Sequence, residues 1–220
     1  MPDVRILSVN LVHAIIADPL GDVGRTAIDK RPADRPVLIE HLGPVGDTVL
    51  DRKHHGGRDQ AVYAYATEDM AAWAAKLERD LAPGGFGENL TTEGLDVTGA
   101  VVGEVWSIAS SDGAEPVRLQ VTCPRMPCVT FQAWMGEPHW VRRFTEHGAP
   151  GAYLRVLTEG TVEAGAPVQV EDRPGHGVTI GEVFRLRLAD PARLRRLLDE
   201  GDDLHPPLVE AVADQLRRSA

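Results

Sequence analysis

The stretch Leu119–Phe131 reads LQVTCPRMPCVTF and organises the middle of the chain. It begins as a strand, because apolar and polar residues alternate from Leu119 to Cys123. Two prolines then end the strand, since proline donates no backbone hydrogen bond and fixes its own φ. The pattern predicts that Cys128 follows this rigid loop at the point where the chain resumes an extended run.

Cys128 can be interpreted in two ways from this stretch. Arg125, three residues earlier, would lower the pKa of the thiol and favour a nucleophile or a metal ligand. A free cysteine is also among the most buried residue types, and it usually only packs. The stretch alone leaves both interpretations open, and the rest of the chain has to decide between them.

The composition is that of a globular protein, with 43% hydrophobic and 25% charged residues in a chain of 220. This length suits one main domain with an appendage or one large β domain. No apolar run approaches the ~20 residues of a membrane helix, and the N-terminus lacks the pattern of an export signal. Two cysteines cannot build a disulfide framework. We therefore expect a cytoplasmic protein that does not associate with membranes.

The net charge of −10 makes duplex nucleic acid a poor partner. Basic residues nevertheless crowd into one segment, at Arg52, Lys53, His54, His55 and Arg58. A local cationic pocket in an acidic protein favours a small anionic ligand over a polymer. A solvated loop would show the same cluster, so the charges alone leave this open.

Two glycine loops stand out upstream of the cysteines. In the first, Gly56 and Gly57 allow the backbone to approach a ligand closely and to present N–H groups to an anion. The ending of a Walker loop and its following helix are absent there. In the second, residues 83–92, Gly87 precedes Glu88 and Asn89. A simple crossover loop would also explain this second segment.

The remaining pattern predicts a β protein with one inserted helix. Short alternating runs recur about every ten residues between Gly and Pro, which is typical of a closed or nearly closed β-barrel. Residues 18–35 look like a long loop. Residues 67–81 form the predicted helix, with Thr67 as its N-cap and an apolar stripe that we assign to the core.

The pattern changes at residues 172–177, which we interpret as a linker. Thr179 and Glu182 then form a capping box, and Asp190 precedes a proline at the first position of a second helix. Pro206 opens a third helix. Three short helices cannot hide their apolar faces alone, so we expect them to dock on the barrel or on a second copy of the chain as a homodimer.

At this point the chain resembles the MOSC-domain family, in particular its YiiM-like branch. Five matching pieces occur in order: Lys30–Pro32, His54–Tyr63, Phe86–Leu90, Pro124–Cys128 and Gly151–Val156. The resemblance implies a mainly β (α+β) fold, with a MOSC-type β-barrel and peripheral helices at residues 1–172. It also implies a small three-helix C-terminal domain at residues 173–220.

The resemblance further implies a protein that binds molybdenum cofactor and reduces N-hydroxylated compounds, such as hydroxylaminopurine-type bases, by oxygen-atom transfer. Cys128 would be the metal ligand, as a soft thiolate for a high-valent metal. His55, His54 and Asp59 are candidates for moving protons. The expected cofactor-binding residues are Lys30, Arg31, His54, Gly56, Gly57, Gly87, Glu88, Asn89 and Arg125.

The electrons would come from a separate flavin or iron–sulfur reductase, because nothing in the sequence resembles such a module. Two other functions remain open. The chain could be a non-catalytic carrier of molybdenum cofactor or of sulfur, using Cys128 as a persulfide. A cysteine hydrolase with His54 or His55 as base is disfavoured, since no orienting third group can be identified. Cys123 is expected to be a core thiol.

Overall fold

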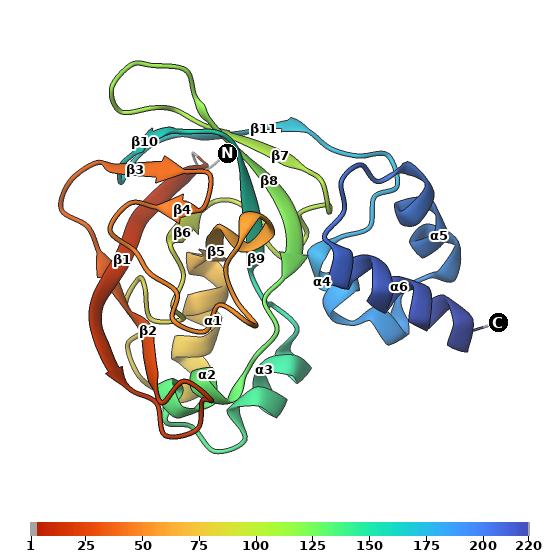
Figure 1. The fold of residues 1–220 in the computed structure, drawn as a ribbon, viewed down its shortest axis with the longest axis horizontal. Helices are drawn as coiled ribbons and strands as arrows, with labels where there is room; N and C mark the ends of the chain where they lie inside the picture. The colour runs from red at the N-terminus through yellow and green to blue at the C-terminus, as the bar shows by residue number, and fades with distance from the viewer. Residues whose placement is uncertain (1–3, 220) are drawn as a thin grey trace.

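The computed structural model describes residues 4–219, so residues 1–3 and 220 of the two predicted domain ranges lie outside it. Eight strands form one sheet in the order β11-β7-β8-β9-β5-β6-β1-β2 (Figure 1). These strands are β1 (Arg5–Ala17), β2 (Arg25–Pro32), β5 (Val62–Ala66), β6 (Leu90–Glu93), β7 (Val105–Ile108), β8 (Val117–Pro124), β9 (Ala152–Thr158) and β11 (Val168–Asp172). A smaller sheet joins β10 (Gly160–Val162), β3 (Val37–Glu40) and β4 (Gly43–Pro44).

Six α-helices surround the strands in the described part of the chain. They are α1 (Thr67–Leu77), α2 (Val129–Met135), α3 (Trp140–His147), α4 (Ile180–Phe184), α5 (Pro191–Glu200) and α6 (Pro206–Arg218). Within residues 4–219, none of the helices has the length and apolar character needed to cross a membrane.

The large sheet curls until the start of β1 meets the residues that lead into β11. Arg5 forms an antiparallel bridge with Pro167, the Ile6 N–H donates to the Ala166 carbonyl at 2.9 Å, and the Val168 N–H returns a bond to Val4. These contacts close the barrel and confirm the predicted mainly β architecture. The pairing of β5 with β6 is parallel, and α1 makes the crossover between these two strands.

Two apolar clusters form the core. The first fills the barrel and includes Ile6, Trp106 and Leu154. The second is aromatic and lies among α1, α2 and α3, where Trp73 and Trp140 pack with ring centroids 4.4 Å apart. The apolar stripe predicted for the helix after residue 67 belongs to this second cluster, so its assignment to the core is confirmed.

Three local predictions are wrong. Residues 18–35 contain a strand, β2, which pairs with the long β1; its mixed charges hid an alternation of inner and outer residues. Helix α1 is capped by Ala66 instead of Thr67 and ends at Leu77, where Glu78 adopts a left-handed conformation. Cys128 precedes helix α2 and not an extended run.

The C-terminal segment contains the three predicted helices, and the capping box of Thr179 and Glu182 is present at the start of α4. Figure 1 shows α4, α5 and α6 together on one side of the barrel. Leu194, Leu197 and Leu208 belong to the same apolar cluster as the barrel interior. The helices therefore dock on their own barrel, as one of the two predicted docking modes requires.

Candidate functional site

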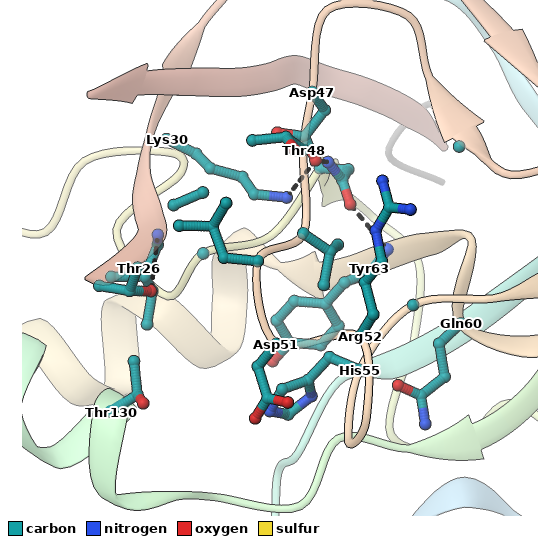
Figure 2. Close-up of a pocket in the computed structure, with 18 of the residues that line it drawn as sticks. Thr26, Lys30, Asp47, Thr48, Asp51, Arg52, His55, Gln60, Tyr63 and Thr130 are labelled. Atoms are coloured by element: carbon teal, nitrogen blue, oxygen red, sulfur yellow. Dashed lines mark hydrogen bonds and ion pairs between the residues drawn. The ribbon is translucent and has the colours of Figure 1, made fainter. Parts of the chain in front are cut away.

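A cavity of about 720 Å³ opens beside the Cys128 loop. This volume is within the usual range for sites that bind small molecules or cofactors. Figure 2 shows Lys30 and Thr26 of β2 on one side. Arg52, His55 and Gln60, from the segment before β5, lie on the other side, with the Tyr63 ring between the two groups.

Strand β8 and helix α2 together place Cys128 on the cavity wall. The strand ends at Pro124 and the helix starts at Val129, so the chain turns sharply between two prolines. Cys128 has an extended backbone, and its carbonyl accepts the first helical hydrogen bond from Gln132 at 3.1 Å. Its side chain is half-buried and borders the cavity.

The environment of Cys128 favours its thiolate. Burial raises the pKa of the thiol, but the His55 side chain, the charge of Arg125 and the Phe131 backbone N–H lower it more. The net effect brings the pKa from 9.0 to about 7. A large fraction of this thiol is therefore ionised near neutral pH, which suits a nucleophile or a metal ligand.

Arg125 is buried at the edge of the same cavity, with 5% of its surface exposed. Its guanidinium lies 3.5 Å from the centroid of the Phe131 ring, in cation–π contact. Its Nη1 atom has no hydrogen-bond partner among the described residues. A buried guanidinium with a free N–H donor is suited to bind an anionic or carbonyl group of a ligand.

Gln60 offers a second unpartnered polar atom. Its Oε1 is buried and accepts no hydrogen bond from the described part of the chain, while the residue lines the cavity. A buried acceptor without a partner is costly, so a ligand N–H or a water is the natural partner there.

Lys30 lines the cavity, but its charge is already neutralised by the protein. Its Nζ lies 2.6 Å from Asp47 Oδ2, and both side chains are nearly buried (Figure 2). Asn89 Nδ2 donates to the same Asp47 oxygen at 2.8 Å, and Asn89 Oδ1 accepts from the Tyr63 N–H. Lys30 and Asn89 therefore form a fixed polar wall.

The predicted site residues divide into those that line the cavity and those that do not. His55, Gly56 and Gly57 come from the first glycine loop. Gly87 comes from the second, with a φ of +76°. Cys128, Arg125, Lys30 and Asn89 complete the set that the fold brings together around the cavity.

Glu88 serves the second glycine loop and not the cavity. It is fully buried and accepts hydrogen bonds from the Gly84 N–H at 2.6 Å, the Phe86 N–H at 3.0 Å and the Thr91 hydroxyl at 2.7 Å. Burial raises the pKa of Glu88, although these hydrogen bonds act in the opposite direction. Glu88 therefore stabilises the fold of the loop that places Gly87 and Asn89 on the cavity wall.

Three other predicted residues do not contribute to the lining. Arg31 is exposed and pairs with Asp29. His54 is exposed, with Nδ1 3.0 Å from Asp51. Asp59 lies outside the cavity and binds Arg155, with an oxygen–nitrogen distance of 2.6 Å. The geometry places His55 against the cavity but gives the other two proton-transfer candidates no access to it.

The cavity also contains residues that the sequence analysis did not select. Gln60, Tyr63 and Tyr153 line it, and each belongs to a segment that carries the family resemblance; Arg52, a member of the predicted basic cluster, lines it as well. Spacing could not show which of their side chains point inward. Asp47 also lines the cavity, and its ion pair with Lys30 joins residues that are 17 positions apart and have no periodic relation.

Comparison with known proteins identifies relatives over most of the chain. The MOSC domain family profile matches residues 51–169. The chain is 33% identical over 198 residues to the uncharacterized protein YflK of Bacillus subtilis (strain 168), covering 89% of this chain and 87% of YflK.

Two further comparisons concern function and fold. A reductase of Gibberella moniliformis is 30% identical over 158 residues, which are 70% of this chain and 27% of the reductase, so the chain spans about a quarter of that relative's length. The crystal structure of YiiM from Geobacillus stearothermophilus superposes with a TM-score of 0.76 at 25% identity, covering 97% of this chain and 99% of that one.

Proposed function

The chain belongs to the MOSC-domain family, in its YiiM-like branch, and from this premise we propose that it binds molybdenum cofactor and reduces N-hydroxylated compounds. The family is associated with this cofactor. The name of the Gibberella relative supports a reductive function, although that protein is much longer. The substrate class is inferred from the family and from the open cavity beside Cys128.

The polar atoms of the cavity fit such a cofactor. The unpartnered Nη1 of Arg125 can donate to a phosphate or to a pterin carbonyl, and Gln60 Oε1 can accept from a pterin N–H. Glycines at residues 56, 57 and 87 keep the lining free of bulk at three points. Lys30 and Arg31, expected to neutralise the phosphate, are each paired with a carboxylate, so Arg125 is the stronger candidate for that role.

Cys128 carries the proposal. Its thiol lines the cavity with a pKa of about 7, and a thiolate is the soft donor that a sulfur-bound, high-valent metal prefers. Cys123, only five residues earlier, lies buried in β8, and burial raises its pKa to about 12. The two thiols therefore have opposite properties, and Cys128 alone of the two has those of a ligand.

Molybdenum cofactor, when bound, supplies two-electron oxygen-atom transfer from an N–OH group. The residues of this chain would bind and orient the cofactor and the substrate, and they would supply the protons. His55 borders both the cavity and Cys128, which supports a role in passing a proton to the oxygen of the N–OH group. Burial raises the pKa of Tyr153 to about 12, so its ring forms a neutral wall. A separate flavin or iron–sulfur reductase would supply the electrons.

The test is expression in a host that makes the cofactor, followed by measurement of bound molybdenum and of 6-hydroxylaminopurine reduction with an artificial electron donor. We expect about one molybdenum per chain and turnover in the wild-type protein. Cys128→Ser should lose at least about a hundredfold in turnover, because the hydroxyl is a poor soft-metal ligand.

Cys123→Ala is the matched control and should retain metal and turnover, because this thiol lies in the core of β8. Full activity and full metal content in Cys128→Ser would contradict the proposal. Bound cofactor without turnover in the wild-type protein would instead indicate a carrier.

A further inference from the structure

Asp59 has a structural role in the first glycine loop that its sequence position did not suggest. It follows Arg58 in a short 3-10 helix at the end of the loop. Its Oδ1 accepts hydrogen bonds from Arg155 Nη2 at 2.6 Å and Nε at 3.0 Å. The Arg155 side chain is only 2% exposed, so this ion pair fixes the end of the loop against strand β9.

A segment from the far end of the chain completes this contact. We name residues Asp202–His205, between α5 and α6, the C-terminal latch. His205 Nδ1 lies 3.0 Å from Asp59 Oδ2, and Asp203 Oδ2 accepts from Arg155 Nη1 at 2.7 Å. The Asp203 carbonyl accepts from Arg155 Nη2 at 2.7 Å, and Asp203 also pairs with Arg58.

The loop held by this latch needs external support. Gly56 and Gly57 have φ values of +81° and +79°, so the chain has wide conformational freedom in the middle of the loop. His55, beside them, borders both the cavity and Cys128. Fixing two glycines costs more backbone entropy than fixing other residues, and contacts at the end of the loop help to offset that cost.

We propose that the C-terminal latch positions the loop of residues 51–60, so that Asp203 and His205 are positioning residues for the cavity although neither lines it. The latch binds Arg58 and Asp59, which directly follow Gly57, and Arg155 of β9 pairs with both Asp59 and Asp203. The C-terminal helices therefore contribute to the site indirectly, because they hold the loop that carries His55. The effect on activity rests on the proposed function, whereas the ordering of the loop does not.

The test is hydrogen exchange measured by mass spectrometry on the full chain without added cofactor. Asp203→Asn removes one charge and keeps the backbone, because Asn tolerates the left-handed φ of 49° at this position. His205→Ala removes the donor to Asp59. In both variants we expect amides of residues 51–61 to exchange about tenfold faster, and amides of the barrel strands to be unchanged.

Two further variants separate positioning from general stability. His205→Gln retains a side-chain N–H that can reach Asp59, so its exchange should return toward the wild-type rate. Asp214→Asn is the matched control, since Asp214 forms an exposed ion pair with Arg217 within α6. Wild-type exchange of residues 51–61 in Asp203→Asn and His205→Ala would overturn the proposal, and so would an equal rise throughout residues 4–219. Neither result depends on whether the protein reduces N-hydroxylated compounds.

Discussion

The two cysteines lie five residues apart, yet they differ in burial and in the pKa of the thiol. Cys123 is buried in β8, whereas Cys128 borders a cavity. The sequence separated them through the prolines, which end the strand before the second thiol. It could not show that Arg125 is buried against Phe131, because that contact depends on how α2 folds back.

His176 is a buried histidine that should make the stability of the protein depend on pH. It is 2% exposed, and its Nδ1 accepts a hydrogen bond from the Val178 N–H at 3.1 Å. Burial lowers the pKa of this histidine below its ordinary 6.5. As the pH falls through 6.5 the unfolded chain binds a proton that the folded chain does not, so the free energy of unfolding decreases. Urea denaturation from pH 7.5 to 5.5 measures this loss.

The variant His176→Gln should show a smaller decrease over the same pH range, because glutamine does not titrate. His13→Gln, at an exposed histidine, should follow the wild-type profile. Equal pH slopes for the wild type and His176→Gln would show that this histidine is not the source of the dependence.

At the scale of elements, the second glycine loop approaches strand β2 so closely that Gly84 has no room for a side chain. A Cβ at this position would lie 2.3 Å from the Lys30 carbonyl oxygen, and its φ is +85°. Gly84→Ala should therefore lower the free energy of unfolding through both backbone strain and a clash with a backbone atom.

Gly113→Ala provides the matched comparison. Its φ is +74°, but nothing lies within 4 Å of a Cβ there. Gly113→Ala should lower the free energy of unfolding by about 1–2 kcal/mol, because of the backbone conformation alone. Gly84→Ala should lower the free energy of unfolding by at least about 2 kcal/mol more, because the clash with the Lys30 carbonyl adds to the backbone strain. Urea denaturation of the two variants measures the difference, and similar losses would mean that the loop moves away from β2 freely.

Most elements were predictable because their residues repeat with the period of a strand or helix. Strands β3, β8 and β11 follow such alternation, β5 is a short apolar run that is buried throughout, and the caps of α4 and α5 could be predicted from Thr179 and Asp190. Strand β2 was missed because Asp29 and Lys30 looked like loop residues. Asp29 is buried and Lys30 is paired with Asp47, and only the tertiary structure supplies that neutralisation.

At the scale of the whole molecule, the barrel and the C-terminal helices share one apolar cluster. We expect them to unfold in one transition. All four tryptophans lie between residues 73 and 140, so fluorescence reports on the barrel and its helices, while circular dichroism also reports on α5 and α6. The two signals should coincide during denaturation.

Leu197→Ala tests this coupling, because Leu197 in α5 is completely buried in the shared cluster. We expect a loss of about 2–5 kcal/mol in the free energy of unfolding, seen equally by both signals. Leu188→Ala, at a leucine that is 83% exposed, should change stability by less than about 0.5 kcal/mol. A loss seen by circular dichroism alone would mean that the helices unfold independently.

The sequence indicated that the three C-terminal helices need a partner surface, but it left open which one. Their own barrel supplies it, and the polar contacts of Asp203 and His205 with Arg155 and Asp59 were not visible from spacing. Long-range ion pairs of this kind join residues that have no periodic relation to one another. They are known only once the fold brings the two segments together.

The contact of His205 with Asp59 also has a consequence in time, because the two residues are 146 positions apart. A chain grows by ~5–20 residues per second during synthesis, so roughly 7 to 30 s separate the two residues on the ribosome. The loop beside Cys128 spends that interval without its contact to His205, and for the first 96 residues of it also without Arg155. All strands of the barrel are synthesised before the C-terminal latch. A ligand that requires the ordered loop can therefore bind only after the latch has been made.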